Sequence, residues 1–198
     1  MKELGWAGSV NEIVMFENRA LHKLVFDEIV WTKEEEQKKR KGLYVKTLEL
    51  KPPQELGLRL FRFWPIMNVL NKSGLARIIA KENAGAYSSC ALIGAIIVEN
   101  RDEAFLTAGR IMERIWLQAT EMKLSLHLIT GVLFLWQRIR VGEAKEFSKE
   151  HINLINNAYK AMAQIFGKPR GIIALLFRIG DGDEPSARSS KLKPVIIS

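Results

Sequence analysis

Residues 91–123, ALIGAIIVENRDEAFLTAGRIMERIWLQATEMK, decide the fold. They begin with ALIGAIIV (91–98), a continuous apolar run rich in β-branched residues, which is typical of a central strand covered on both faces. From Glu103 to Lys123, apolar residues recur every three or four positions, and this spacing predicts a long helix. We expect this helix to be buried in the middle of the fold.

The sequence that follows predicts one more helix and one more buried strand. Ser148 is a good helix cap, and the apolar residues of 149–166 fall on one helical face until Gly167 ends the pattern. GIIALLFRI (171–179) is a second apolar strand, whereas SLHLITGVLFLW (125–136) is expected to be an apolar connection. Together with an amphipathic helix over 18–29, these segments predict the α+β class, with a central sheet flanked by helices.

Composition and charge limit the possible classes of protein. The chain has 198 residues, with 47% hydrophobic and 26% charged residues, which suits one globular domain. Its net charge of +8 leaves nucleic acid, an anionic membrane surface or a phosphorylated cofactor as partners. Because Cys90 is the single cysteine, no internal disulfide or Cys-based zinc site can form, and we expect a buried structural thiol. No signal peptide or spanning segment is recognisable, so we expect a cytoplasmic protein.

The chemistry-bearing residues match no catalytic or metal motif. There is no P-loop, no GxGxxG after a strand, no HExxH and no GxSxG. His22, His127 and His151 are far apart in sequence and lack partners at metal-ligand spacing, so we expect core or solvated roles and no metal. One class of enzyme that fits such a sequence relies on a bound cofactor, which the protein holds and orients.

Two segments resemble the nitroreductase-like family of flavoproteins. Residues 108–134, AGRIMERIWLQATEMKLSLHLITGVLF, are similar to the family pattern AGRxxxRxxLxATxxxL and the loop that follows it. Residues 171–196, GIIALLFRIGDGDEPSARSSKLKPVI, resemble the family's late strand, glycine turn and basic stretch. The resemblance implies a single nitroreductase-like domain over 1–198, in which 1–90 is a divergent helical part and 91–198 resembles the family.

The resemblance also implies a cofactor, partners and a site. Members of the family are homodimers that hold FMN and use NAD(P)H to reduce a nitroaromatic, a quinone or a similar acceptor. By position, Thr130 and Gly131 correspond to the loop beside the flavin ring, and a glycine allows a backbone to approach a planar ring closely. Arg188 and Lys191 correspond to basic positions that reach the FMN phosphate. The apolar run 195–197 is expected to pair with a sheet edge and to be exchanged between subunits. We expect no residue to be catalytic in itself, because the flavin is the reactive group.

Two alternatives stay open. The Arg-Ser-x-Arg motif with which family members normally begin is not present, and this favours a non-catalytic, flavin-free dimer that acts as a binding or interaction module. Plain alternatives for the site residues are a turn glycine at 131 and an exposed basic loop at 188–191. Nucleic-acid binding rests only on the net charge and the run KKRK (38–41), and since the basic residues are dispersed we expect no nucleic-acid partner. No membrane partner is expected.

Overall fold

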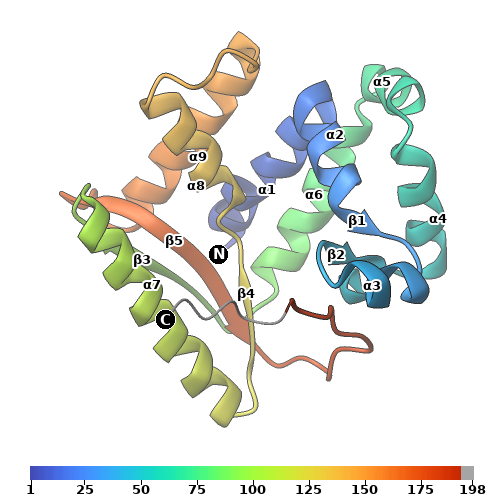
Figure 1. Ribbon diagram of the computed structural model, residues 1–198. Helices are drawn as coiled ribbons and strands as arrows, with labels where there is room; N and C mark the ends of the chain where they lie inside the picture. The colour runs from blue at the N-terminus through green and yellow to red at the C-terminus, as the bar shows by residue number, and fades with distance from the viewer. Residues whose placement is uncertain (193–198) are drawn as a thin grey trace, which may run out of the picture. The chain divides into compact units, whose positions relative to one another are not determined.

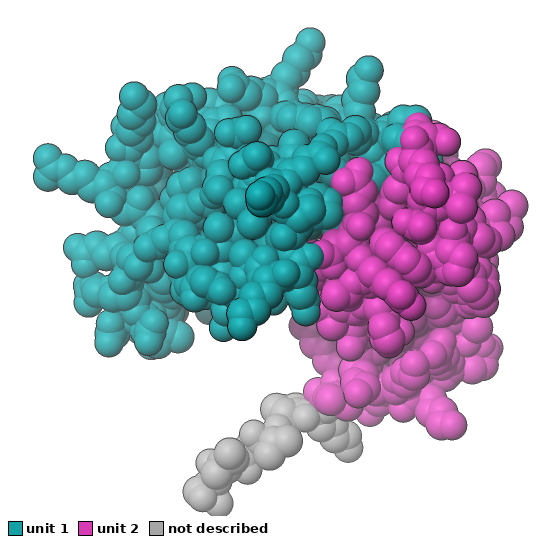
Figure 2. Space-filling view, turned by 90° about the horizontal axis from the view of Figure 1, so that it is seen from above, with its two compact units in different colours: residues 1–14, 74–183 teal, residues 15–73, 184–198 magenta. Residues whose placement is uncertain are grey.

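The computed structural model describes residues 1–192, and within this range the protein has the mixed helix and strand content of the α+β class. The chain forms two compact units, which are coloured separately in Figure 2. Unit 1 comprises residues 1–14 and 74–183, and the rest of the described chain belongs to unit 2. The run 195–197, predicted to pair with a sheet edge, lies outside the described residues.

Unit 1 contains a three-stranded antiparallel sheet in the order β3-β5-β4. Figure 1 shows these strands together with the helices of the unit. Its elements, in chain order, are the first part of α1 (Lys2–Glu17), α6 (Leu75–Ser88), β3 (Leu92–Val98), α7 (Asp102–Glu121), β4 (Ser125–Leu128), α8 (Gly131–Arg140), α9 (Lys149–Ile165) and β5 (Ile172–Gly180).

Both buried strands that the sequence predicts are present, but the prediction of which one is central was wrong. β5 pairs with both neighbours, whereas β3 is paired on one side only among the described residues. Side chains near both ends of β3 are exposed to solvent: Leu92 is 51% exposed and Ile97 is 37% exposed. An apolar run shows that a strand is buried on part of its surface, but it does not give the position of that strand in the sheet.

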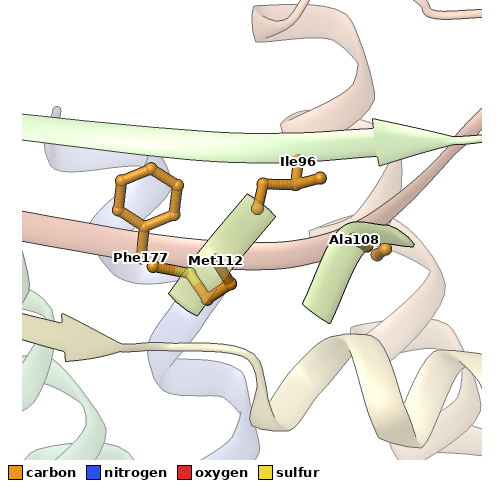
Figure 3. Packing of buried hydrophobic residues seen from close by; sticks show 5 residues of the cluster. Ile96, Ala108, Met112 and Phe177 are labelled. Carbon is orange, nitrogen blue, oxygen red and sulfur yellow. The ribbon is translucent and has the colours of Figure 1, made fainter. Parts of the chain in front are cut away.

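The predicted long helix is confirmed as α7, but it is not buried in the middle of the fold. It covers one face of the sheet, where Ala108 and Met112 pack with Ile96 of β3 and Phe177 of β5 (Figure 3). The other side of the helix is open, with Leu106 69% and Leu117 65% exposed. A helix that rests on a sheet buries one stripe only, and the many apolar residues of α7 exceed what that stripe needs.

Gly94 allows the largest side chain of this core to fit. It is opposite Phe177 in the pairing of β3 with β5. A Cβ atom added to Gly94 would lie 2.5 Å from Cζ of the Phe177 ring. The phenyl ring therefore occupies the space that any other residue at position 94 would fill.

The segment 125–136 is not the simple connection that the sequence predicts. Its first residues form β4, the other edge of the sheet, and Gly131 begins α8. α8 then packs against α9. The predicted cap of α9 is confirmed, because Oγ of Ser148 accepts a hydrogen bond of 3.1 Å from the backbone N–H of His151.

α1 is an element that the sequence patterns did not predict. Val10, Ile13 and Val14 are at most 1% exposed, and Ser9 is fully buried as well. A helix that is buried on several sides has no polar face and hence no amphipathic period, which is why the pattern gives no indication of it.

Unit 2 is mainly helical and contains one pair of two-residue strands, β1 and β2, which are parallel. Asn18 caps α2, as its side chain accepts hydrogen bonds from the N–H groups of Ala20 and Leu21. Thr32 caps α3 in the same way, because its hydroxyl oxygen accepts a hydrogen bond from the N–H of Glu35. The elements are α2 (Arg19–Glu28), β1 (Ile29–Val30), α3 (Lys33–Lys39), β2 (Leu43–Tyr44), the 3-10 turn η1 (Val45–Leu48), α4 (Pro52–Phe61) and α5 (Trp64–Lys72).

Among the described residues, no helix combines the length and the apolar character needed to cross a lipid bilayer.

Candidate functional site

Thr130 and Gly131 lie in unit 1, at the start of α8. The chain leaves β4 with a hydrogen bond of 2.9 Å from the N–H of Ile129 to the carbonyl of Leu176, and the carbonyl of Thr130 accepts the first helical bond, from Leu133. The N–H groups of the first helical turn have no acceptor within the helix, so they can donate hydrogen bonds to an electronegative group of a ligand.

The missing side chain at Gly131 has a specific neighbour within unit 1. A Cβ atom added there would lie 2.6 Å from Cγ of Asn11 on α1. Packing against this amide is therefore sufficient to explain why position 131 is a glycine. The structure adds this reason to the plain turn and to the close approach of a flavin, the two readings that the sequence leaves open.

Arg188 and Lys191 lie in unit 2, on a segment that hydrogen bonds anchor. The N–H and hydroxyl of Ser186 donate to the carboxylate of Glu49, at 2.7 and 2.9 Å. The N–H of Ser190 donates to Glu36, and hydrogen bonding from Ser190 lowers the pKa of that carboxyl group. Both basic side chains are exposed, and neither has an ion-pair partner within residues 1–192. Thr130 and Gly131 are thus brought together in one unit, and Arg188 and Lys191 in the other.

A polar cluster in unit 1 joins residues that the sequence analysis did not single out as a site. Glu12 of α1 is only 8% exposed, and its Oε1 accepts a hydrogen bond of 2.6 Å from the hydroxyl of Tyr87 on α6. Its Oε2 is buried and has no hydrogen-bond partner of standard geometry among the described residues. Burial raises the pKa of Glu12, while hydrogen bonds from Tyr87 and Asn83 act in the opposite direction.

Arg178 extends this cluster to the sheet. Its guanidinium carbon lies 5.3 Å from the centroid of the Tyr87 ring, and one of its Nη atoms donates to the carbonyl of Ala86. Its Nε donates to Nδ1 of His127 on β4, at 3.3 Å. Burial and the nearby Glu12 carboxylate raise the pKa of Tyr87, so the phenol keeps its proton and donates.

The cluster combines a buried carboxyl group, a phenol, a guanidinium and an imidazole from four elements. Buried titratable groups with shifted pKa values are frequent at functional sites, and they also occur in purely structural networks. The sequence contained one indication of it: Arg178 interrupts the apolar run LLFRI. The partners of Glu12 and Arg178 are 75 and 51 residues away in the chain, beyond the reach of any local pattern.

The remaining histidines and the cysteine have local roles. His22 is 2% exposed, and its Nε2 is 2.7 Å from the carbonyl oxygen of Phe61, so the predicted core role is confirmed. His151 is also buried, next to the cap of α9. Cys90 is half-buried, and its thiol donates to the carbonyl of Tyr87. Within residues 1–192, no group of three or more potential ligands is arranged to hold a metal ion.

No protein-family model, curated protein or solved structure matches this chain.

Proposed function

We propose that this chain is an FMN-dependent oxidoreductase of nitroreductase-like fold, which acts as a homodimer with an exchanged C-terminal strand. NAD(P)H would be oxidised, and a nitroaromatic, quinone or similar acceptor would be reduced by two electrons. A bound flavin would supply the hydride chemistry. The proposal rests on the resemblance of residues 108–134 and 171–196, and the observation that carries it is the anchored basic segment of unit 2.

That segment has the properties of a phosphate-binding element. Glu36 and Glu49 fix its backbone through Ser190 and Ser186, so the positions of Arg188 and Lys191 along it are restrained. Both cations are exposed and lack an acidic partner among the described residues, which leaves their donors available. A phosphate group carries close to two negative charges and forms charge-assisted hydrogen bonds with such donors.

In unit 1, the start of α8 supports the other half of the proposal. Thr130 is 6% exposed, and its carbonyl accepts the first hydrogen bond of the ten-residue helix α8, from the N–H of Leu133. The N–H groups of Gly131 and of the next residue could donate to polar atoms of a flavin ring, because they have no acceptor within the helix. The exposed cations of unit 2 are therefore compatible with the cofactor, whereas beside Gly131 the amide of Asn11 already lies close to the backbone.

A comparison of FMN with riboflavin, which lacks the phosphate, tests the role of the cations directly. We expect the purified protein to bind FMN more tightly than riboflavin. The double variant Arg188→Ala and Lys191→Ala should bind FMN at least tenfold more weakly, since each charge-assisted contact contributes about 1.5–3 kcal/mol. Riboflavin binding should be almost unchanged.

The matched control removes two exposed cations from unit 1, Arg114→Ala and Lys160→Ala. It changes the net charge by the same amount and should leave the preference for FMN intact. If both double variants lose FMN affinity to the same extent, the loss is due to the change in net charge and not to contacts of Arg188 and Lys191. Failure of the wild-type protein to bind FMN would refute the proposal.

The second candidate is a flavin-free dimer that serves as a binding module, and the contact of Asn11 with Gly131 favours it. Asn11 occupies the space beside the glycine that the first proposal assigns to close approach. This candidate predicts a folded, colourless dimer that takes up no FMN. Because both candidates are dimers, sedimentation velocity followed at a visible wavelength that FMN absorbs separates them: only the first candidate predicts that flavin sediments with the dimer.

A further inference from the structure

A cavity of about 180 Å³ lies in unit 1, where α7, α8 and the beginning of β5 meet. α7 contributes Phe105 and Gly109, α8 contributes Phe134, Trp136 and Gln137, and residues 172–175 of β5 form the remaining wall. We refer to it as the α7–α8 cavity. It shares no residue with the Glu12 cluster or with the four residues that the proposed function uses.

The lining defines the chemistry that fits. Three aromatic side chains and several aliphatic ones surround the space, and every lining residue is uncharged. A phosphate or carboxylate would lose its hydration here without a compensating charge. Gln137 has the one polar side chain in the lining, and its amide can both donate and accept a hydrogen bond.

Size and order agree with this chemistry. A closed apolar cavity of about 150 Å³ can hold benzene, so the volume of the α7–α8 cavity is sufficient for a single ring. Unlike that example, the α7–α8 cavity is open to solvent, because Phe134 in its wall is 59% exposed. Its wall is also held in place, because the indole of Trp136 stacks on Tyr159 with a centroid distance of 3.4 Å. The guanidinium of Arg140 lies 5.0 Å from the Trp136 ring centroid. A restrained wall lowers the ordering cost of binding.

We propose that the α7–α8 cavity binds a small molecule with one uncharged aromatic ring that carries one hydrogen-bonding group, as in a phenol. The ring would lie among Phe105, Phe134 and Trp136, and its polar group would pair with Gln137. This inference does not depend on the proposed flavin chemistry, because it concerns ligand binding by the protein without a cofactor.

Two glycines allow a matched test by substitution. A Cβ atom on Gly109 would meet nothing within 4 Å, and the same holds for Gly85, an exposed residue of α6 outside the cavity. Gly109→Leu should therefore fold and fill part of the cavity, whereas Gly85→Leu adds the same side chain elsewhere. Phe134→Ala removes an aromatic side chain that is 59% exposed, so it also should not disturb the core.

The experiment is a titration with phenol and with benzene, followed by ligand-observed NMR and calorimetry on the full chain. We expect saturable phenol binding by the wild-type protein and by Gly85→Leu, and at least a tenfold loss of affinity in Gly109→Leu and Phe134→Ala. Benzene should bind more weakly than phenol, and Gln137→Leu should remove that difference.

Several results would overturn the inference. Absence of saturable phenol binding, or equal affinity in Gly109→Leu and Gly85→Leu, would show that the cavity is not a ligand site. Benzene binding as tight as phenol binding would remove the role of Gln137. If phenol does not bind and Gly109→Leu changes the mass measured by sedimentation, the cavity belongs to a protein interface instead.

Discussion

At the scale of single residues, the buried Glu12 is the group with the clearest consequence for stability. Its Oε1 accepts a hydrogen bond from Tyr87, its Oε2 is buried, and burial raises the pKa of the carboxyl group. A raised pKa means that the folded protein binds the proton more tightly than the unfolded chain. The folded state is therefore favoured when Glu12 is protonated and loses that advantage as the pH rises through the pKa of the folded state.

Glu12→Gln, which resembles the protonated form, tests this pH dependence. The free energy of unfolding of the wild-type protein should fall, relative to the variant, as the pH rises above the ordinary carboxyl range near 4.5, and the difference should level off above the folded pKa. Urea unfolding between pH 4.5 and 8 measures the difference. Glu82→Gln, on the exposed side of α6, is the control. A pH-independent difference would show that Glu12 does not titrate in this window.

Tyr87→Phe addresses the other half of the pair. The change removes the hydroxyl that donates to Glu12 and leaves a buried acceptor without a partner. We expect a loss of about 1–3 kcal/mol in the free energy of unfolding at neutral pH. In the background of Glu12→Leu, where no acceptor is left, Tyr87→Phe should cost clearly less. An equal cost in both backgrounds would mean that the two side chains are not coupled.

Residue-scale features were the hardest to predict from the sequence. Arg188 and Lys191 could be proposed because they follow a strand in a recognisable basic stretch. Their segment is anchored by Glu49 and Glu36, however, through hydrogen bonds to residues 137 and 154 positions away in the chain. The same holds for Arg178, which meets His127 across the sheet. Such pairs arise from tertiary packing, so the spacing of residues along the sequence does not predict them.

At the scale of elements, the sequence predicts those whose burial is one-sided or whose ends are capped. Ser148 identifies the start of α9, and the three- and four-residue spacing identifies α7. α1 was missed because it is buried on several sides, and β4 was missed because four residues are too few to show an alternation.

Gly94→Ala tests how tightly the elements of the sheet fit together. The new methyl group would overlap with the ring of Phe177, which is 5% exposed and cannot move freely. We expect a loss of about 1–3 kcal/mol in the free energy of unfolding. The control is Gly85→Ala on α6, which has open space and should stabilise the helix by up to about 1 kcal/mol.

A compensating change makes this prediction specific. Phe177→Leu shortens the side chain that faces Gly94, so Gly94→Ala should cost less in that background than in the wild-type protein. Equal costs in the two backgrounds would show that the penalty does not come from contact with the ring.

At the scale of the whole molecule, the α+β class followed from two apolar strands and three periodic helices, whereas the order of the strands did not. Hydrophobic pattern records how much of an element is buried, and the position of β5 between its neighbours depends on long-range pairing. The division into two compact units depends on long-range contacts in the same way, because unit 1 combines the first residues of the chain with 74–183.

The function at this scale depends on whether the folded chain takes up FMN. Thr130 and Gly131 belong to unit 1, and Arg188 and Lys191 belong to unit 2. Bound FMN would raise the stability of the folded protein, and the more so the tighter it binds, since a ligand that binds only the native state stabilises it.

The most direct test of FMN binding is the visible absorption spectrum of the purified protein. It is recorded before FMN is added, and again after FMN has been added and the unbound cofactor removed. We predict a yellow protein with the bands of bound flavin, which bleach when NADH or NADPH is added without oxygen. A folded protein that stays colourless after incubation with excess FMN would contradict the account.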